Sequence, residues 1–139
     1  MAAAPVFVNT PKITPAAFTN ADSANAKKTI ATAGTSGSKV VGVTAASTDS
    51  STRIAQLWLT RSATSYLLAS TVVAITAGSD GATGAQDLMT ATLWPGLSND
   101  GTTGQRFFFL ESGDTLQVSF TTVITAAKEI DVVAHFANF

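Results

Sequence analysis

The chain has a single histidine, His135, and this limits the hydrolytic chemistry available to it. A serine nucleophile needs a base within hydrogen-bond reach, and the base needs a third group to orient it. Asp131 shares a predicted strand face with His135, but four residues of extended chain separate the two by about 13 Å. We therefore predict that His135 is a surface residue of a strand, and we expect no catalytic residue.

Two other patterns resemble ligand sites without meeting their chemical requirements. The glycine-rich stretch 78–84 lacks the Gly-Lys-Ser/Thr ending that binds phosphate, so we interpret it as a surface loop. Oxygen ligands for calcium are present at Asp80, Asp87, Asn99 and Asp100, but not in the alternating spacing that surrounds one ion. We expect no metal and no cofactor.

Three aromatic residues, Trp58, Tyr66 and Trp94, are candidates for stacking against sugar rings. Aromatic residues inside apolar runs more often belong to a core, and this favours the core for Trp58 and Tyr66. Trp94 precedes Pro95 at a predicted corner and is the one candidate for a surface contact.

Charge is scarce, since Asp, Glu, Lys and Arg make up 12% of the chain, against roughly 25% in an average soluble domain. Such a surface offers little charge repulsion, so we expect it to be partly covered in a homo-oligomer, a dimer or trimer. The basic residues are scattered along the chain, and without a basic stripe we expect no nucleic-acid partner. They are Lys12, Lys27, Lys28, Lys39, Arg53, Arg61, Arg106 and Lys128.

The chain contains no cysteine, which excludes disulfides and thiolate metal sites. No stretch approaches the roughly 20 apolar residues of a membrane helix, so we expect no membrane partner. The first eight residues lack a charged region and are interrupted by Pro5, so we do not expect a signal peptide.

Residues 1–19 contain three of the four prolines, and proline excludes a central strand or a helix interior. We predict an extended N-terminal arm over 1–19 and a single domain over 20–139. The large apolar residues of the arm need burial, either along the edge of their own domain or on a neighbouring subunit. These candidate partner-binding residues are Val6, Phe7, Val8, Ile13 and Phe18.

The C-terminal quarter, residues 105–139, predicts three strands joined by tight turns in an antiparallel meander. Residues 115–120 alternate apolar with polar, which places Leu116, Val118 and Phe120 on a core face. Residues 130–136 alternate in the same way. The apolar run 107–110 has no such alternation and predicts a strand covered on both faces.

Further short strands are predicted upstream, with turn residues between them. Segments 29–33 and 39–45 form a predicted hairpin, 53–60 a central strand, and 65–76 a long apolar strand that bends near 69–71. About seven to nine strands without a long helix indicate an all-β fold, a jelly-roll-like antiparallel β-sandwich.

From Arg53 to Phe139 the sequence resembles small structural proteins of tailed bacteriophages, most closely a capsid cement, or decoration, protein. The resemblance rests on the phrases Leu93-Trp94-Pro95-Gly96-Leu97, Gly113-Asp114-Thr115-Leu116 and residues 121–130, and on the terminal Phe139. It departs at residues 134–139, where related chains often carry two glycines.

This resemblance implies a non-enzymatic protein on the outer capsid surface of the virion, where it binds the major capsid protein and stabilises the shell. Such proteins often reach the next subunit with an arm. The alternative, from a different class, is a tail-fibre or baseplate module that binds host glycan through Trp94 and the loops 78–84 and 98–104.

Overall fold

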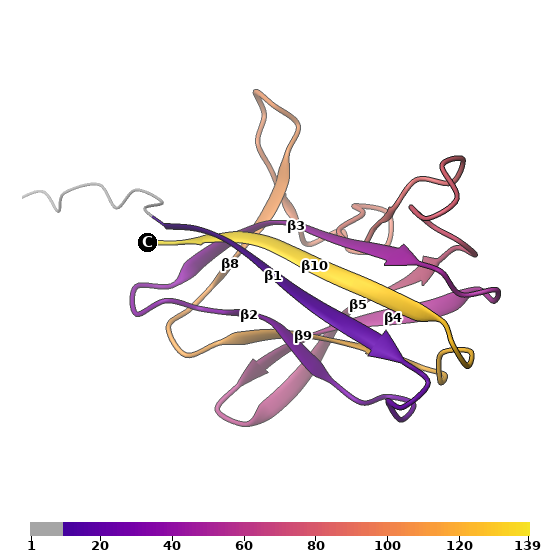
Figure 1. Cartoon of the computed structure of the whole chain (residues 1–139). Coiled ribbons are helices and arrows are strands. Elements are labelled where there is room, and N and C mark those ends of the chain that lie inside the picture. Colours follow the sequence, from indigo (N-terminus) through magenta and orange to yellow (C-terminus); the bar gives the residue numbers. More distant parts are fainter. Residues whose placement is uncertain (1–9) are drawn as a thin grey trace, which may run out of the picture.

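The computed structural model describes residues 10–139 as an all-β sandwich, and the predicted antiparallel sandwich is confirmed (Figure 1). No helix in this range is long and apolar enough to cross a membrane. The strands are β1 (Thr10–Thr19), β2 (Lys28–Thr32), β3 (Ser38–Ser47), β4 (Arg53–Arg61), β5 (Thr64–Val73), β6 (Gln86–Asp87), β7 (Ser98–Asn99), β8 (Arg106–Leu110), β9 (Thr115–Phe120) and β10 (Glu129–Asn138).

The strands form two sheets that face each other. The six-stranded sheet has the order β1-β10-β3-β8-β7, with β6 paired to β3, and the four-stranded sheet has the order β2-β9-β4-β5. Every pairing in both sheets is antiparallel. Figure 1 shows β1, β10 and β3 above β2, β9 and β4.

The long strands pair in a nested order. β1 pairs with β10, β2 with β9, β3 with β8, and β4 with β5. Successive strands β1 to β4 therefore alternate between the two sheets, and β8 to β10 alternate again on the return. This nested winding is the one expected of an eight-stranded jelly roll, with β6 and β7 added between β5 and β8.

Two predicted local pairings are wrong. β2 and β3 do not form a hairpin, and β8, β9 and β10 do not form a meander, because in each case consecutive strands lie in opposite sheets. The turn residues were recognised correctly, since residues 34–37 and 111–114 do reverse the chain. A turn sequence does not determine whether the next strand returns beside the first or crosses the core.

The core lies between the sheets and follows the alternation seen in the sequence. Leu116, Val118 and Phe120 of β9 are buried, as predicted. The inward residues of β10 are buried with them: Ile130, Val132, Ala134 and Phe136. β4 is a central strand between β9 and β5, also as predicted, and Leu68 of β5 is an extra residue at a bulge beside the expected bend.

The prediction that residues 107–110 are covered on both faces is wrong. Leu110 is buried, but 59% of Phe109 is exposed on the outer face of the six-stranded sheet. The apolar run reflects a strand with one face in the core and a second face that is apolar and open.

Candidate interaction surface

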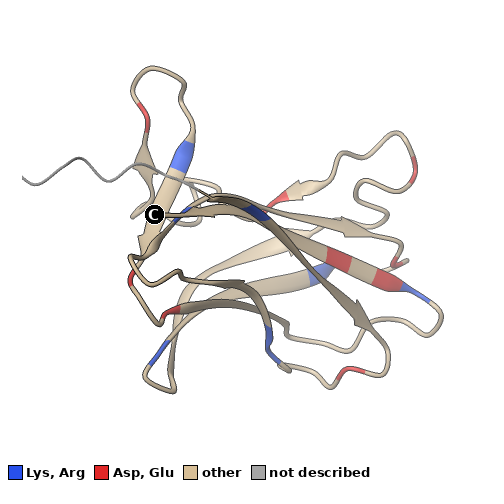
Figure 2. Ribbon diagram, turned by 60° about the vertical axis from the view of Figure 1, so that its left-hand side comes forward, with Lys and Arg blue, Asp and Glu red and all other residues tan. Residues whose placement is uncertain are grey.

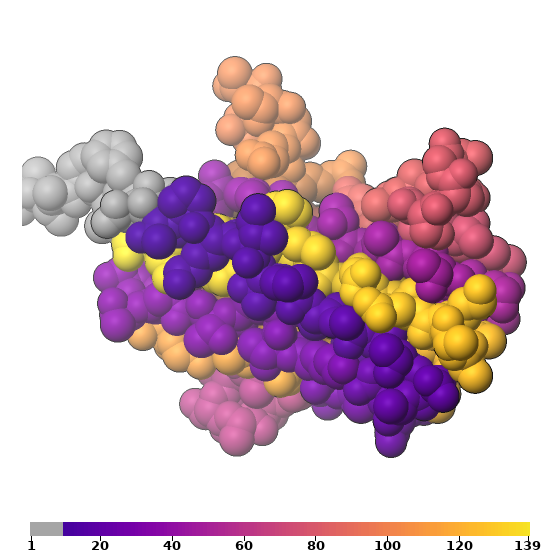
Figure 3. All heavy atoms as spheres, viewed as in Figure 1, coloured from indigo at the N-terminus to yellow at the C-terminus, as the bar shows by residue number. Residues whose placement is uncertain are grey.

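Residues 74–105 separate β5 from β8 and contain only the two-residue strands β6 and β7. We call this segment the insertion. Its loops project from the sandwich around residues 76–85 and 98–105, as Figures 1 and 3 show in salmon and orange. Loops of this length without regular structure in a compact domain are often functional.

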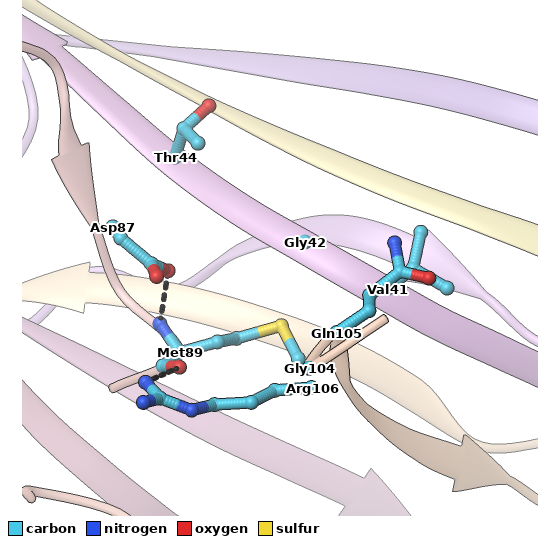
Figure 4. A pocket seen from close by; sticks show the side chains of 8 residues that line it. All are labelled: Val41, Gly42, Thr44, Asp87, Met89, Gly104, Gln105 and Arg106. Atoms are coloured by element: carbon cyan, nitrogen blue, oxygen red, sulfur yellow. Dashed lines mark hydrogen bonds between the residues drawn. The ribbon is translucent and has the colours of Figure 1, made fainter. Parts of the chain in front are cut away.

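A hollow of about 400 Å³ lies where the insertion crosses β3. Figure 4 shows the backbone of β3 as its floor, with Asp87, Met89 and Arg106 around it. The Asp87 carboxylate accepts a hydrogen bond from the Met89 N–H (2.8 Å), and the Arg106 guanidinium donates to the Met89 carbonyl (3.3 Å). The bond from Arg106 fixes the insertion to the start of β8.

The hollow is open, and its lining includes the acid Asp87, the base Arg106 and Thr44, which is paired with Asp87 across β3 and β6. Among residues 10–139 no group of three or more His, Cys, Asp or Glu side chains could hold a metal ion.

A partly exposed aromatic cluster lies on the outer face of the six-stranded sheet, with Phe109 as its exposed member. It consists of Phe107, Phe109 and Phe139, with ring centroids 5.4 Å apart for the first pair and 5.9 Å apart for Phe109 and Phe139. The Lys39 ammonium lies 4.3 Å from the centre of the Phe107 ring. Thr10, where the described chain begins, pairs with Asn138 next to this cluster.

The structure describes only residues 10–19 of the predicted arm, residues 1–19. Residues 10–19 form β1, an edge strand of the six-stranded sheet, so these residues belong to the sandwich instead of a separate arm. Phe18 is only 2% exposed and packs on Phe120, so it is a core residue and cannot contact a partner. Ile13 is 67% exposed on the outer face. Val6, Phe7 and Val8 lie outside the described residues.

Trp94 lies in the insertion and is half-buried. Its indole packs on Phe108, with ring centroids 4.7 Å apart, at the margin of the core. One of its faces is therefore occupied within the chain, which limits its use as a sugar platform.

The carboxylates of Asp80, Asp87 and Asp100 accept hydrogen bonds within their own loops. Asp80 accepts hydrogen bonds from the Thr83 and Ala82 N–H groups at 2.6 and 2.8 Å, and Asp100 accepts one from the Thr102 N–H at 2.8 Å. The Thr83 hydrogen bond, with others from its loop, holds the pKa of Asp80 well below its usual range. These carboxylates stabilise turns.

Charged groups elsewhere are also used internally. Asp49 is buried and accepts hydrogen bonds from Arg53 (2.7 Å) and from the Thr125 hydroxyl (2.6 Å), tying the β3–β4 and β9–β10 loops together. Asp114, whose side chain is 1% exposed, accepts two bonds from Arg61, both 2.7 Å. Figure 2 shows how much of the remaining ribbon carries no charge.

Sequence reasoning missed a second apolar surface, on β4, β5 and the chain just after them. Exposed side chains there include Ile54, Leu67 and Val72, which are 43%, 50% and 50% exposed, and also Tyr66 and Ile75. The segment was recognised as the longest apolar stretch, but an apolar edge strand and a buried strand have similar composition. The position of β5 at a sheet edge was needed to distinguish them.

Comparison with known proteins gives one structural likeness. No protein-family model matches the chain, and no curated protein matches it. A solved structure described as "Cyanophage Pam1 capsid asymmetric unit" contains a chain that aligns with a TM-score of 0.50 and 16% identity. The alignment covers 100% of this chain and 94% of that one, so the two folds correspond along their whole length.

Proposed function

We propose that this protein is a virion structural protein of a tailed bacteriophage, a cement protein that binds the outside of the major capsid protein lattice and stabilises the shell. The observation that carries the proposal is the full-length likeness to a chain of a phage capsid assembly. At 16% identity the likeness concerns the fold, and the function is inferred from it together with the surface.

The surface supports a role in assembly. The aromatic cluster of Phe107, Phe109 and Phe139 offers an apolar contact on one sheet face, next to the hollow beneath the insertion. Aromatic residues on a surface of low charge are typical of protein interfaces. A contact of modest strength is sufficient when it is repeated over many copies of a lattice.

The N-terminal residues Val6, Phe7 and Val8, with the exposed Ile13 of β1, are the proposed additional contact with a neighbouring subunit. They directly precede or belong to the strand that borders the six-stranded sheet. We further propose that the protein forms a small homo-oligomer, a dimer or trimer, on the shell.

Co-sedimentation of the purified protein with empty phage shells tests this function. The expected result is binding at high copy number together with a higher temperature of shell rupture. Replacing Phe109 by serine should weaken binding to the shell by about tenfold in dissociation constant, because one exposed aromatic anchor contributes about 1–2 kcal/mol to such a contact.

The matched control is Val123→Ser. Val123 is 44% exposed in the loop before β10. It lies far from the aromatic cluster, because Phe139 of that cluster follows the opposite end of β10. This variant should bind as the unaltered protein does. A protein that never associates with shells would contradict the proposal.

The alternative function, a tail-fibre or baseplate module that binds host glycan, has the same test. Failure to bind shells, together with loss of host adsorption in a Trp94→Ala variant that remains folded, would establish it instead. Since the Trp94 ring packs on Phe108, no observation on the described chain favours this alternative.

A further inference from the structure

The edges of the two sheets differ in how they are protected against pairing with another chain. An unprotected edge strand presents a row of unpaired N–H and C=O groups, and proteins block it with proline, lysine, a bulge or short length. β1 carries Pro11, Lys12 and Pro15. β2 is five residues long and has a bulge and Lys28, and β7 has two residues.

β5 has no proline and no charged residue over its ten residues, although it carries a bulge at Leu68. It is the outer strand of the four-stranded sheet, and its partner on the inner side is β4. Within residues 10–139, no backbone hydrogen bond outside the sheets joins β5 to any other segment. The free side of β5 is therefore a long, uncharged row of donors and acceptors.

The solvent face beside this edge is largely apolar, and one ammonium, that of Lys27, lies on it 4.3 Å from the centre of the Trp58 ring. Val72 lies opposite Ile54, and Leu67 lies opposite Trp58. The Trp58 indole N–H is already used, since it donates to the Ser119 hydroxyl at 2.9 Å. The two arginines at the ends of β4 are bound to Asp49 and Asp114. An approaching strand thus meets no unpaired charge from β4.

We propose that β5 pairs antiparallel with β5 of a second copy of this chain, joining the two four-stranded sheets into one. A second copy supplies an uncharged strand of the same length, and a twofold axis makes two identical strands antiparallel. This is the direction of every strand pair in the molecule.

The side chains are compatible with a register centred on Ser70. Ser70 and Val72 are exposed, whereas Ala69, Thr71 and Val73 face the core. With the axis at Ser70, Ala69 lies opposite Thr71 of the second copy, and both face inward, as opposite residues of a pair must. Because Leu68 is bulged out, Leu67 then lies opposite Val72 and Tyr66 opposite Val73, so apolar residues meet across the interface.

The first test is the oligomeric state of the full chain by sedimentation equilibrium. The protein should dimerise, and Ser70→Lys should weaken the dimer by about tenfold or more, because the two lysines would face each other at the axis. The control is Ser98→Lys, which places the same charge on exposed β7 and should leave the dimer unchanged. Circular dichroism and a denaturation midpoint establish that both variants fold.

The second test uses the absence of cysteine from the chain. A Ser70→Cys variant should form an intermolecular disulfide under mild oxidation, because residues opposite each other bring their Cβ atoms within reach of a disulfide. Ser98→Cys should form none. A wild-type protein that stays monomeric, or a dimer indifferent to Ser70→Lys and without the Ser70 crosslink, would overturn the proposal.

The inference stands on β5 itself and does not depend on shell binding. If the protein dimerises through β5 but does not co-sediment with shells, the inference about β5 still holds and only the proposed function fails. A monomer whose binding to shells is lost in Ser70→Lys would assign β5 to the shell protein, and would refute pairing with a second copy.

Discussion

Phe18 of β1 and Phe120 of β9 pack edge to face across the interior, with ring centroids 4.9 Å apart and planes inclined by 74°. β1 lies in the six-stranded sheet and β9 in the four-stranded sheet, so this pair joins the two layers. The pair also anchors β1 to the core, although the proline content of residues 1–19 predicts an arm.

Replacing Phe18 by alanine should lower the free energy of unfolding by about 3–5 kcal/mol, because it leaves a cavity against Phe120. Chemical denaturation measures this loss. Ile13→Ala on the same strand is the control, and it should change stability by no more than about 0.5 kcal/mol because Ile13 is largely exposed. Equal effects of the two substitutions would contradict the assignment of Phe18 to the core.

Asp49 predicts a specific dependence of stability on pH. Burial favours the neutral acid, but hydrogen bonds from Arg53, Thr125 and Ser51 outweigh it and hold the pKa of Asp49 well below its usual range. Because the pKa is lower in the folded state, the stabilisation is present above the unfolded pKa of about 3.9 and is lost as the pH falls below it.

Asp49→Asn should therefore cost about 3 kcal/mol at neutral pH, since it leaves the Arg53 charge without its partner. Unfolding curves between pH 7 and pH 2 should show a smaller decline below about pH 4 in the variant than in the unaltered protein. The same acid-induced decline in both would show that Asp49 does not carry this dependence.

Gly37 closes the turn between β2 and β3 with φ of +89°, and a Cβ there would lie 2.7 Å from the Leu110 carbonyl oxygen. Gly37→Ala should reduce the free energy of unfolding by more than about 1 kcal/mol, through both backbone strain and this contact. Gly84→Ala is the control, because a Cβ at Gly84 meets nothing within 4 Å. A thermal melt compares the two; equal melting temperatures would refute the strain argument.

Deleting residues 2–9 should leave a folded sandwich, because β1 and its pairing with β10 begin at Thr10. A longer deletion that removed residues 10–18 as well would take away an edge strand and Phe18. We expect the short deletion to keep the denaturation midpoint and to reduce the bound copy number in shell co-sedimentation.

A triple replacement of Val6, Phe7 and Val8 by serine in the full-length chain is the companion to this deletion. It removes the apolar side chains without shortening the chain, and it should reduce shell binding to a similar degree. Undiminished binding of both proteins would refute a contact through these residues.

Much of the candidate surface was out of reach of sequence reasoning. The corner position of Trp94 indicated a surface contact, and the insertion around it does line the hollow, but Phe109 was expected to be covered and the exposure of Leu67 was not predicted. A run of apolar residues has the same sequence pattern whether or not a second layer of the structure covers it. Whether such a side chain is exposed depends on whether other strands or loops cover its strand, and this is a property of the assembled sheets.

The sequence by itself determined several of the strands and their inward faces. Alternation in 115–120 and 130–136 identified the buried residues of β9 and β10, because a strand's two faces repeat every second residue whatever its neighbours are. Only the tertiary structure decided which sheet each strand joins. β8 and β9 are separated by one tight turn yet lie in opposite sheets, while β1 pairs with β10 at the other end of the chain. Which strands pair depends on how the apolar faces of the two sheets are buried against each other, and this involves residues far apart in the chain. No local sequence pattern predicts it.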